Sequence, residues 1–343
     1  MSIVEDVWFG RSAVASAARV ALWPLSVAYG LAVAGRNRLY DAGLLASRVP
    51  VLPVVSVGNL TVGGTGKTPV SAWIAGRLAE RARTAVVLRG YGDDEVEVHA
   101  RLNPAIPVVA NADRFQAVRE AQRRGAEIAV LDDAYQHRRI RPTVQVLLVS
   151  AEQLARPRRL LPAGPWREAL TAARRAHLIV ITRKSAGAGA ADDARQLVLA
   201  ATPGIPTTVV HLAPADLRSL RGGASLALER LRGAAVLAIA AIGEPDSFHR
   251  QLEALGAVVT MRAFRDHHAF SDAEMASLAA QAPADGLVVC TLKDAVKLDS
   301  RWPAPSRLWY LSQQLVVERG EDAMNSLLER ALQARASAAT FAG

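Results

Sequence analysis

Apolar and polar residues follow two different patterns along the chain, and each pattern predicts its own kind of element. The first pattern is a long apolar run from Ala13 to Ala34, in which Arg19 is the single charged residue and Pro24 interrupts the run. From Pro53 onward, short β-branched runs alternate with amphipathic segments. Alternation of strands with helices predicts a parallel sheet that is covered by helices on both faces.

Six apolar runs in the first two thirds of the chain have the continuous character of buried parallel strands: PVVSVG, TAVVLR, EIAVLDD, VQVLLVS, HLIVIT and TTVVHL. Amphipathic stretches such as RFQAVREAQRRG and DDARQLVLAA separate several of them and predict helices. A Gly- and Arg-rich stretch, RSLRGGASLALERLRGAA, then predicts a junction between two lobes. Beyond it, AVLAIAAIG, VVTMRAF, LVVCTL and RLWYLS resume the alternation.

The N-terminal apolar run admits two interpretations. A spanning helix needs about 20 uncharged apolar residues, which this run approaches but does not reach cleanly. Trp8, Trp23, Tyr29 and Tyr40 are of the type that sits at headgroup depth. We expect a membrane-associated helix that is inserted shallowly or spans once. The alternative is a buried core helix.

Composition narrows the class of protein and its partners. The chain has 343 residues and 51% hydrophobic residues, which is enough for two globular domains. A single cysteine, Cys290, excludes an internal disulfide framework. The net charge of +9 favours an anionic partner, but an aromatic content of 5% supplies little base stacking, so we expect no nucleic acid.

The strongest motif is VGNLTVGGTGKTP, which lies between a predicted strand and a predicted helix. Its end matches the phosphate-binding pattern G-x-x-x-x-G-K-[ST], although Thr61 stands where that pattern has its first glycine. Pro69 fits only in the first turn of a helix, so the helix should begin at Lys67 or Thr68. Glycine backbone amides and the helix N-terminus then cradle phosphate, Lys67 reaches the outer phosphates, and the Thr68 hydroxyl ligates Mg²⁺.

Two acidic clusters follow predicted strands. Asp132 and Asp133, in EIAVLDDAYQH, are placed to hold Mg²⁺ through its waters, and one of them could instead cap the next turn. Asp93, Asp94 and Glu95, after TAVVLRGYG, could supply a general base for a hydroxyl nucleophile. On pattern alone, a solvated loop is an equally good interpretation of this second cluster.

The remaining candidates lie in four other stretches. FRDHHAFSDAEM places Asp266, His267 and His268 just before a helix with Ser271 and Glu274 as a capping box. TLKDAVKL carries two of the four lysines in the chain, plausible contacts for anionic groups of a substrate. ITRK likewise places Arg183 and Lys184 where they could contact anionic groups of a substrate. RRLLPAGPWREAL indicates an ordered loop.

These motifs, in this order, resemble the tetraacyldisaccharide 4′-kinase family, the lipid A kinases of Gram-negative bacteria. The resemblance runs from the N-terminal helix to about Leu298, and it depends on VGNLTVGGTGKTP, RGYG followed by DE, LDDAYQH, LLPAGPWRE, TRK, DHHAFS and TLKDAVKL. The family carries serine or threonine at the position of Thr61. The resemblance implies an α/β fold: a P-loop NTPase-like parallel-sheet core, a smaller α/β lobe, and an N-terminal membrane-associated helix.

We expect the helix and linker at 1–50, the P-loop kinase core at 51–215, and the second lobe with the C-terminal helix at 216–343.

The resemblance also implies an activity and a set of site residues. The activity is transfer of the ATP γ-phosphate to the 4′-hydroxyl of tetraacyldisaccharide 1-phosphate, which gives lipid IVA, at the cytoplasmic face of the inner membrane. Asp94 and His267 match the catalytic pair, and Thr68, Asp132 and Asp133 match the Mg²⁺ site. The ATP-binding positions are Thr61, Val62, Gly63, Gly64, Thr65, Gly66, Lys67 and Thr68. Substrate contacts are expected at Glu95, Arg89, Arg183 and Lys293.

Several positions depart from the family pattern. The segment between RGYG and the acidic cluster is short, so the choice of Asp94 over Asp93 depends on the register of this segment. Ala134 and Tyr135 replace a glycine and a phenylalanine, Arg265 replaces a proline, and Leu292 replaces a glutamate.

Two other functions can be compared with the kinase. A nucleotide-dependent switch or assembly protein at the membrane is the main alternative. A guanine-specific switch would show an N-K-x-D element, which TRKS and TLKD do not match. A membrane module with a dead site is disfavoured by the intact Lys67, Thr68, Asp132, Asp133 and Asp94.

Overall fold

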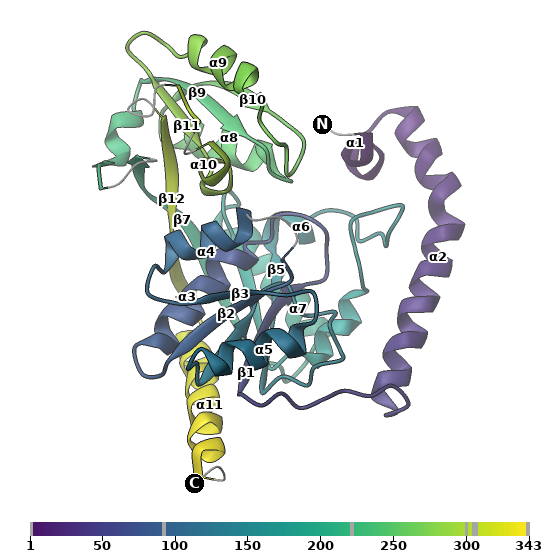
Figure 1. The fold of residues 1–343 in the computed structure, drawn as a ribbon. Helices are drawn as coiled ribbons and strands as arrows, with labels where there is room; N and C mark the ends of the chain where they lie inside the picture. Colours follow the sequence, from purple (N-terminus) through teal and green to yellow (C-terminus); the bar gives the residue numbers. More distant parts are fainter. Residues whose placement is uncertain (1–2, 91–93, 220–222, 299–300, 304–307, 341–343) are drawn as a thin grey trace.

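The computed structural model describes residues 3–90, 94–219, 223–298, 301–303 and 308–340 of the chain. Figure 1 shows two lobes stacked along one long axis, with the N-terminal helices beside them. The helices are α1 (Ile3–Phe9), α2 (Ala13–Asp41), α3 (Lys67–Ala79), α4 (Asp94–Leu102), α5 (Arg114–Arg123), α6 (Ala151–Leu154), α7 (Ala188–Ala201), α8 (Pro245–Ala254), α9 (Asp272–Ala280), α10 (Leu292–Leu298) and α11 (Glu321–Thr340). The strands are β1 (Val54–Asn59), β2 (Thr84–Leu88), β3 (Val108–Ala110), β4 (Ile128–Leu131), β5 (Val144–Ser150), β6 (Leu178–Arg183), β7 (Thr207–Ser219), β8 (Ser225–Leu226), β9 (Ala235–Ala240), β10 (Val258–Ala263), β11 (Leu287–Cys290) and β12 (Leu308–Arg319).

One sheet runs through both lobes. Its strand order is β10-β9-β11-β12-β7-β6-β5-β1-β4-β2-β3, with β8 paired to β7. All ten predicted strands are present, and the short strands β3 and β8 are additions that their few apolar residues did not indicate. The predicted fold class, a parallel α/β core with a second α/β lobe, is confirmed.

The direction of the strands reverses where the two lobes meet. The core strands from β3 to β7 pair in parallel, whereas β12 is antiparallel to β7, and β11, β9 and β10 follow β12 in parallel. The carboxyl ends of the core strands therefore face the second lobe, and the carboxyl ends of β9, β10 and β11 face the core. Ligands of open α/β sheets bind at carboxyl ends of strands, so this reversal brings two sets of such ends around one site.

The C-terminal helix belongs to the core, which corrects the prediction that placed it in the second lobe. Met324, Leu327 and Ala331 of α11 are buried in the same apolar cluster as Val57 of β1 and Ile74 of α3. The long strand β12 returns the chain from the second lobe to the core before α11 begins. Because β7 also runs past residue 215, the predicted boundary at that position falls inside a strand.

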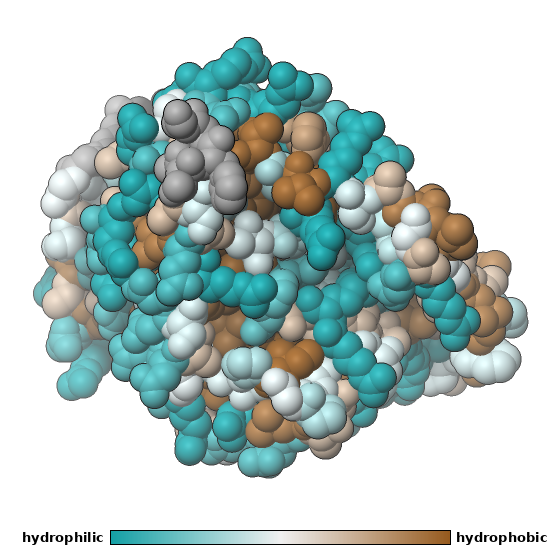
Figure 2. Space-filling model, turned by 90° about the horizontal axis from the view of Figure 1, so that it is seen from below, coloured by the Kyte–Doolittle hydropathy of each residue, from teal (hydrophilic) through white to brown (hydrophobic). Residues whose placement is uncertain are grey.

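The N-terminal helix α2 lies against the side of the core and is mostly exposed (Figures 1 and 2). Only Ala15 and Ser26 of this helix are buried among the described residues, which rules out the alternative of a core helix. The helix is continuous through Pro24, the residue that interrupts the apolar run. Proline in a helix removes one backbone hydrogen bond, and an exposed carbonyl can accept one from water instead. By length and hydropathy, α2 could cross a bilayer.

Candidate active site

The phosphate loop connects β1 to α3, and its backbone geometry explains its glycines. Helix α3 begins at Lys67, as predicted. Gly63 and Gly66 have φ values of 112° and 84°, a region that side chains disfavour. At Gly66 a Cβ atom would also lie 2.3 Å from the Leu212 side chain, so only glycine fits there. The loop thus presents backbone amides beside the positive end of the α3 dipole.

Hydrogen bonds with neighbouring side chains hold the loop in its conformation. Asn59 donates to the Thr65 hydroxyl at 2.7 Å, and Thr182 on β6 donates to the Thr65 carbonyl at 2.9 Å. Thr61 is 4% exposed, and its hydroxyl donates to Gln153 of α6. Thr61, the residue that departs from the general phosphate-loop pattern, therefore supports the conformation of the loop through this hydrogen bond.

Lys67 and Asp133 face one another at the start of α3. The Lys67 ammonium lies 3.8 Å from Asp133, and Arg167 donates to the same carboxylate at 3.3 Å. Burial lowers the pKa of Lys67, and the negative charge of Asp133 opposes that shift. Asp133 has a positive φ of 49°, which turns its side chain toward these two cations.

Asp132 points into the protein, and three donors satisfy its carboxylate. It accepts from the Ser71 hydroxyl at 3.0 Å and the Asp133 backbone amide at 2.9 Å, and its second oxygen lies 3.0 Å from His99. Burial by itself would raise the pKa of Asp132, but His99, the Lys67 charge and the Ser71 hydrogen bond together outweigh it and hold the pKa below its usual value. The adjacent carboxylates thus point in different directions.

The carboxylates around the loop form a donor set that suits Mg²⁺. Burial raises the pKa of Glu95, and the charges of Asp132, Asp94 and Asp133 raise it further. A divalent cation would relieve this repulsion. Among the described residues, no group of three or more His, Cys, Asp or Glu side chains could hold a metal unaided. Mg²⁺ commonly takes one or two carboxylates and completes its shell with waters and phosphate oxygens, so the residues fit this ion.

Asp94 is in the first turn of α4, not in the solvated loop that was the alternative interpretation. Its Oδ2 atom lies 3.2 Å from His267 Nδ1 and 3.7 Å from the Lys297 ammonium, and Asp94 is 10% exposed. Acidic side chains are stabilised at helix N-termini, which explains why the cluster folds as a helix. The fold brings Asp94 and His267 together across the two lobes, whereas Asp93 lies outside the described residues.

The four expected substrate residues have different surroundings. The positive charge of Lys293 lowers the pKa of both Glu95 and Lys67. Lys293 therefore lies near Glu95 and near the phosphate loop. Arg89 is exposed at the end of β2, and its charge acts on Arg114. Arg183 does not fit the expectation, since it donates to Glu318 of β12 and the Ala186 carbonyl. Its guanidinium therefore has structural partners.

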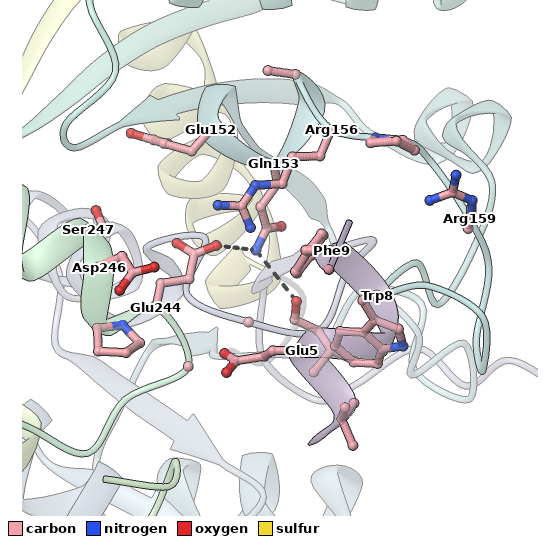
Figure 3. A pocket seen from close by; sticks show the side chains of 18 of the residues that line it. Glu5, Trp8, Phe9, Glu152, Gln153, Arg156, Arg159, Glu244, Asp246 and Ser247 are labelled. Carbon is pink, nitrogen blue, oxygen red and sulfur yellow. Dashed lines mark hydrogen bonds between the residues drawn. The ribbon is translucent and has the colours of Figure 1, made fainter. Parts of the chain in front are cut away.

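A cavity of about 960 Å³ opens between the phosphate loop and α1 (Figure 3). Trp8 and Phe9 contribute apolar groups to its lining, Arg156 and Arg159 contribute basic groups, and Glu244 lies beside Gln153. The Arg156 guanidinium lies 4.4 Å from the centre of the Phe9 ring. Gln153 donates to Glu244 at 3.0 Å and so connects the core to the second lobe beside the loop.

Several residues of the site were missed by sequence reasoning. They are Ser71, His99, Arg114, Gln153, Arg167 and Glu244. Burial lowers the pKa of Arg114 to about 10, and this side chain is 3% exposed. Lys297 was predicted, together with Lys293, to contact anionic groups of a substrate, and the structure places its ammonium against Asp94. The others are ordinary residues of helices and loops, and only the tertiary contacts identify them.

The N-terminal helices are tied to this site through the segment between α6 and the 3₁₀ helix Leu170–Arg175. Ser26 and Tyr29 of α2 donate to the carbonyls of Leu160 and Arg167, each at 3.0 Å. The Arg167 side chain contacts Asp133, as described above. The predicted ordered loop LLPAGPWRE therefore joins the apolar helix to the phosphate loop.

Comparison with known proteins gives consistent matches over nearly the whole chain. A family model described as tetraacyldisaccharide-1-P 4′-kinase (LpxK) matches residues 18–333, which extends past the predicted limit near Leu298. The tetraacyldisaccharide 4′-kinase of Anaeromyxobacter sp. (strain Fw109-5) is 39% identical over 97% of each chain. That of Halorhodospira halophila (strain DSM 244 / SL1) is 34% identical over 86% of this chain and 88% of its own.

A solved structure of the same family also supports the architecture. It is a crystal structure of an "apo" form of LpxK from Aquifex aeolicus in complex with ATP. The two chains are 28% identical, with a TM-score of 0.72, and the match covers 91% of this chain and 99% of the other.

Proposed function

This chain belongs to the tetraacyldisaccharide-1-P 4′-kinase family, as its sequence predicted, and from that premise we propose its reaction and the residues that perform it. The reaction is transfer of the ATP γ-phosphate to the 4′-hydroxyl of tetraacyldisaccharide 1-phosphate, with lipid IVA and ADP as products. The observation that carries the proposal is the contact of Asp94 with His267. His267 belongs to the second lobe, which faces the phosphate loop.

The phosphate loop is the proposed site for the ATP phosphates. Between Thr61 and Thr68, the amides of Val62 and Thr65 donate to the carbonyls of Pro165 and Gly63, and the other loop amides and the α3 dipole are proposed to stabilise anionic oxygens. The Lys67 side chain is 17% exposed, and its ammonium can reach the transferred phosphate and neutralise charge there. Phosphoryl transfer depends mostly on positioning and charge stabilisation, and this loop supplies both.

Asp94 is the proposed acceptor of the proton from the 4′-hydroxyl. As the hydroxyl oxygen forms its bond to the γ-phosphorus, the bond from phosphorus to the ADP oxygen breaks, and the hydroxyl proton passes to the carboxylate. His267 lies against the same carboxylate oxygen at 3.2 Å and positions it. General-base assistance of this kind contributes roughly 10²–10⁴-fold in rate.

Thr68, Asp132 and Asp133 are the residues that would hold Mg²⁺. When bound, the ion neutralises negative charge on the phosphates during transfer. The residues themselves are already organised, because Ser71 and His99 fix Asp132, and Lys67 and Arg167 fix Asp133.

The lipid acceptor is proposed to approach from the cytoplasmic face of the inner membrane along α2. The exposed apolar side of this helix and the cavity beside the loop are joined by α1, which contributes Trp8 and Phe9. Glu95, Arg89 and Lys293 remain candidates for contacts with the polar headgroup. Arg183 is left out of this set because Glu318 already occupies its guanidinium.

The activity is tested with purified protein, radiolabelled ATP, Mg²⁺ and tetraacyldisaccharide 1-phosphate. We expect label in a lipid product that migrates more slowly than the substrate. A preparation with Lys67→Ala should bind ATP weakly and form no product. Absence of labelled lipid, while a known kinase of the family labels the same substrate, would refute the assignment.

A further inference from the structure

Asp94 makes a second contact across the lobes, which the proposed reaction does not use. Lys297, on α10 of the second lobe, places its ammonium 3.7 Å from Asp94 Oδ2, the oxygen that also contacts His267. The Asp94 and Lys297 side chains are 10% and 15% exposed, so water screens their attraction little. The helices α10 and α4 that carry them also pack against one another.

Lys297 is itself held in place by a buried carboxylate. Asp294, one turn earlier on α10, lies 3.9 Å from the Lys297 ammonium and is fully buried. The Thr291 hydroxyl donates to Asp294 at 2.6 Å, and the Ala241 backbone amide donates to both of its oxygens at 3.1 Å. Three hydrogen bonds from two donors therefore fix the carboxylate that anchors the ammonium.

The same carboxylate reaches the other partner of Asp94. Ala241, whose amide donates to Asp294, accepts a hydrogen bond at its carbonyl from the His267 backbone amide at 3.3 Å. The contacts close a ring: Asp94 to Lys297, Lys297 to Asp294, Asp294 to Ala241, Ala241 to His267, and His267 back to Asp94. Asp294 thus supports both groups that hold the Asp94 carboxylate.

The third contact of Asp94 comes from its own helix. The Glu95 backbone amide donates to Asp94 Oδ1 at 3.1 Å. Oδ1 is therefore oriented by the core, and Oδ2 by two groups of the second lobe. A carboxylate with only one of these restraints could rotate about its side-chain bonds.

We propose that Lys297 is a positioning residue, which holds Asp94 in its productive orientation across the boundary between the lobes. This inference depends on the proposed role of Asp94 as the proton acceptor. Lys297 acts through Asp94 and does not itself touch the nucleotide or the lipid. Displacement of a reacting group by about 1 Å can cost roughly 10²-fold in rate, which sets the scale of the expected effect.

A double-mutant cycle tests this inference in the full-length chain. The variants are Lys297→Met, which keeps the length of the side chain without its charge, and Lys297→Arg, which keeps the charge. Each is made in the wild type and in Asp94→Asn. We expect Lys297→Met to lower kcat by about 10- to 100-fold, with KM for MgATP and for the lipid changed less than about 2-fold. Lys297→Arg should recover part of the loss.

The coupling to Asp94 is the decisive measurement. In the Asp94→Asn background, Lys297→Met should change the residual kcat by less than about 2-fold, because the group that it positions is gone. A full and additive loss in that background would overturn the inference, since Lys297 would then act on substrate or on the fold. So would a rise in KM with kcat unchanged.

Asp294→Asn serves as the second variant, because it removes the charge that anchors Lys297 and keeps the size of the side chain. We expect it to lower kcat in the same direction, and ATP binding of every variant shows that the phosphate loop is intact. If the kcat of Lys297→Met equalled that of the wild type, the positioning role would be refuted and the proposed function would stand. A wild type that forms no lipid product would instead refute the proposed function.

Discussion

Among the described residues, Asp133 and His267 are the two that have positive φ without being glycine. Both lie in the candidate site, one from each lobe. Such conformations cost roughly 1–3 kcal/mol each and are retained where the surrounding contacts fix them. Lys67 and Arg167 provide those contacts for Asp133, and Asp94 together with the Ala241 carbonyl provides them for His267.

The first residue-scale prediction concerns the choice between Asp94 and Asp93. Asp94→Asn should lower kcat by roughly 10²–10⁴-fold, because an amide cannot accept the hydroxyl proton. ATP affinity should change little, since the proposed site of the phosphates is the loop and not α4. Single-turnover kinetics and equilibrium binding of ATP measure the two quantities.

Asp93→Asn is the matched control, because it makes the same chemical change one residue earlier. We expect its kcat to stay within a few-fold of the wild type. If Asp93→Asn were the variant that lost activity, the register across the short segment would be wrong.

The second residue-scale prediction is a pH dependence of stability at Glu152. One oxygen of this carboxylate accepts from the backbone amides of Lys184, Ser185 and Ala186 at 2.7, 3.1 and 3.1 Å. Burial would raise the pKa of Glu152, but these hydrogen bonds outweigh it and hold the pKa below its usual value. The stabilisation is therefore present above about pH 4.3 and is lost as the pH falls through the pKa of the folded state.

Glu152→Gln should lower the melting temperature at pH 7 by an amount that corresponds to about 2 kcal/mol. The difference from the wild type should shrink as the pH falls from about 4.3 through the pKa of the folded state, below which the carboxyl is protonated in both states. Thermal unfolding at several pH values measures it, with Glu80→Gln, an exposed carboxylate, as control. A difference that is constant with pH would contradict the charge-dependent role.

At the scale of elements, α2 presents one apolar face to the outside of the molecule. Val20, Trp23 and Leu31 are 73%, 65% and 69% exposed, and they lie along one side of the helix. Residues on another side, Ser26 and Tyr29, donate to the core. The helix can therefore remain docked on the core while its exposed face enters a lipid surface.

Replacing Val20, Trp23 and Leu31 together by Glu should abolish flotation of the protein with vesicles of phosphatidylethanolamine and phosphatidylglycerol. The physical reason is that three charges replace apolar area at the depth of the acyl chains. A triple variant with the same charge change away from α2, Gln122→Glu, Asn325→Asp and Ser326→Asp, is the control. Equal flotation of the two variants would mean that the core itself carries the membrane contact.

A second prediction at this scale follows from the position of α11. Met324 is fully buried against the core, so Met324→Ala should reduce the free energy of unfolding by about 2–5 kcal/mol. Ser326→Ala, an exposed neighbour on the same helix, should have little effect. Chemical denaturation of both variants measures the difference. Equal stability would show that α11 is not part of the cooperative core.

At the scale of the whole molecule, the net charge of +9 should contribute to membrane binding. Binding to vesicles that contain anionic lipid should weaken as salt rises from about 0.05 to 0.5 M, because the Debye length falls several-fold. The α2 face should keep part of the binding at high salt, since apolar burial is not screened. Binding that does not respond to salt would leave the apolar helix as the main contact.

The fold was predictable to the extent that local patterns determine it. The buried strands were recognisable because their apolar runs are continuous, and the start of α3 was fixed by Pro69. The capping box of Ser271 and Glu274 was likewise predicted and is present. Asp94 and Glu95 were harder, since an acidic cluster has the same composition in a loop and in the first turn of a helix.

The sequence by itself determined the family, the parallel core and the phosphate loop, because each of these depends on residues that are close together in the chain. Only the tertiary structure decided that β12 reverses the sheet, that α11 returns to the core, and that Lys297 meets Asp94. These contacts join segments separated by many residues, and no local propensity specifies which partner such a side chain will meet.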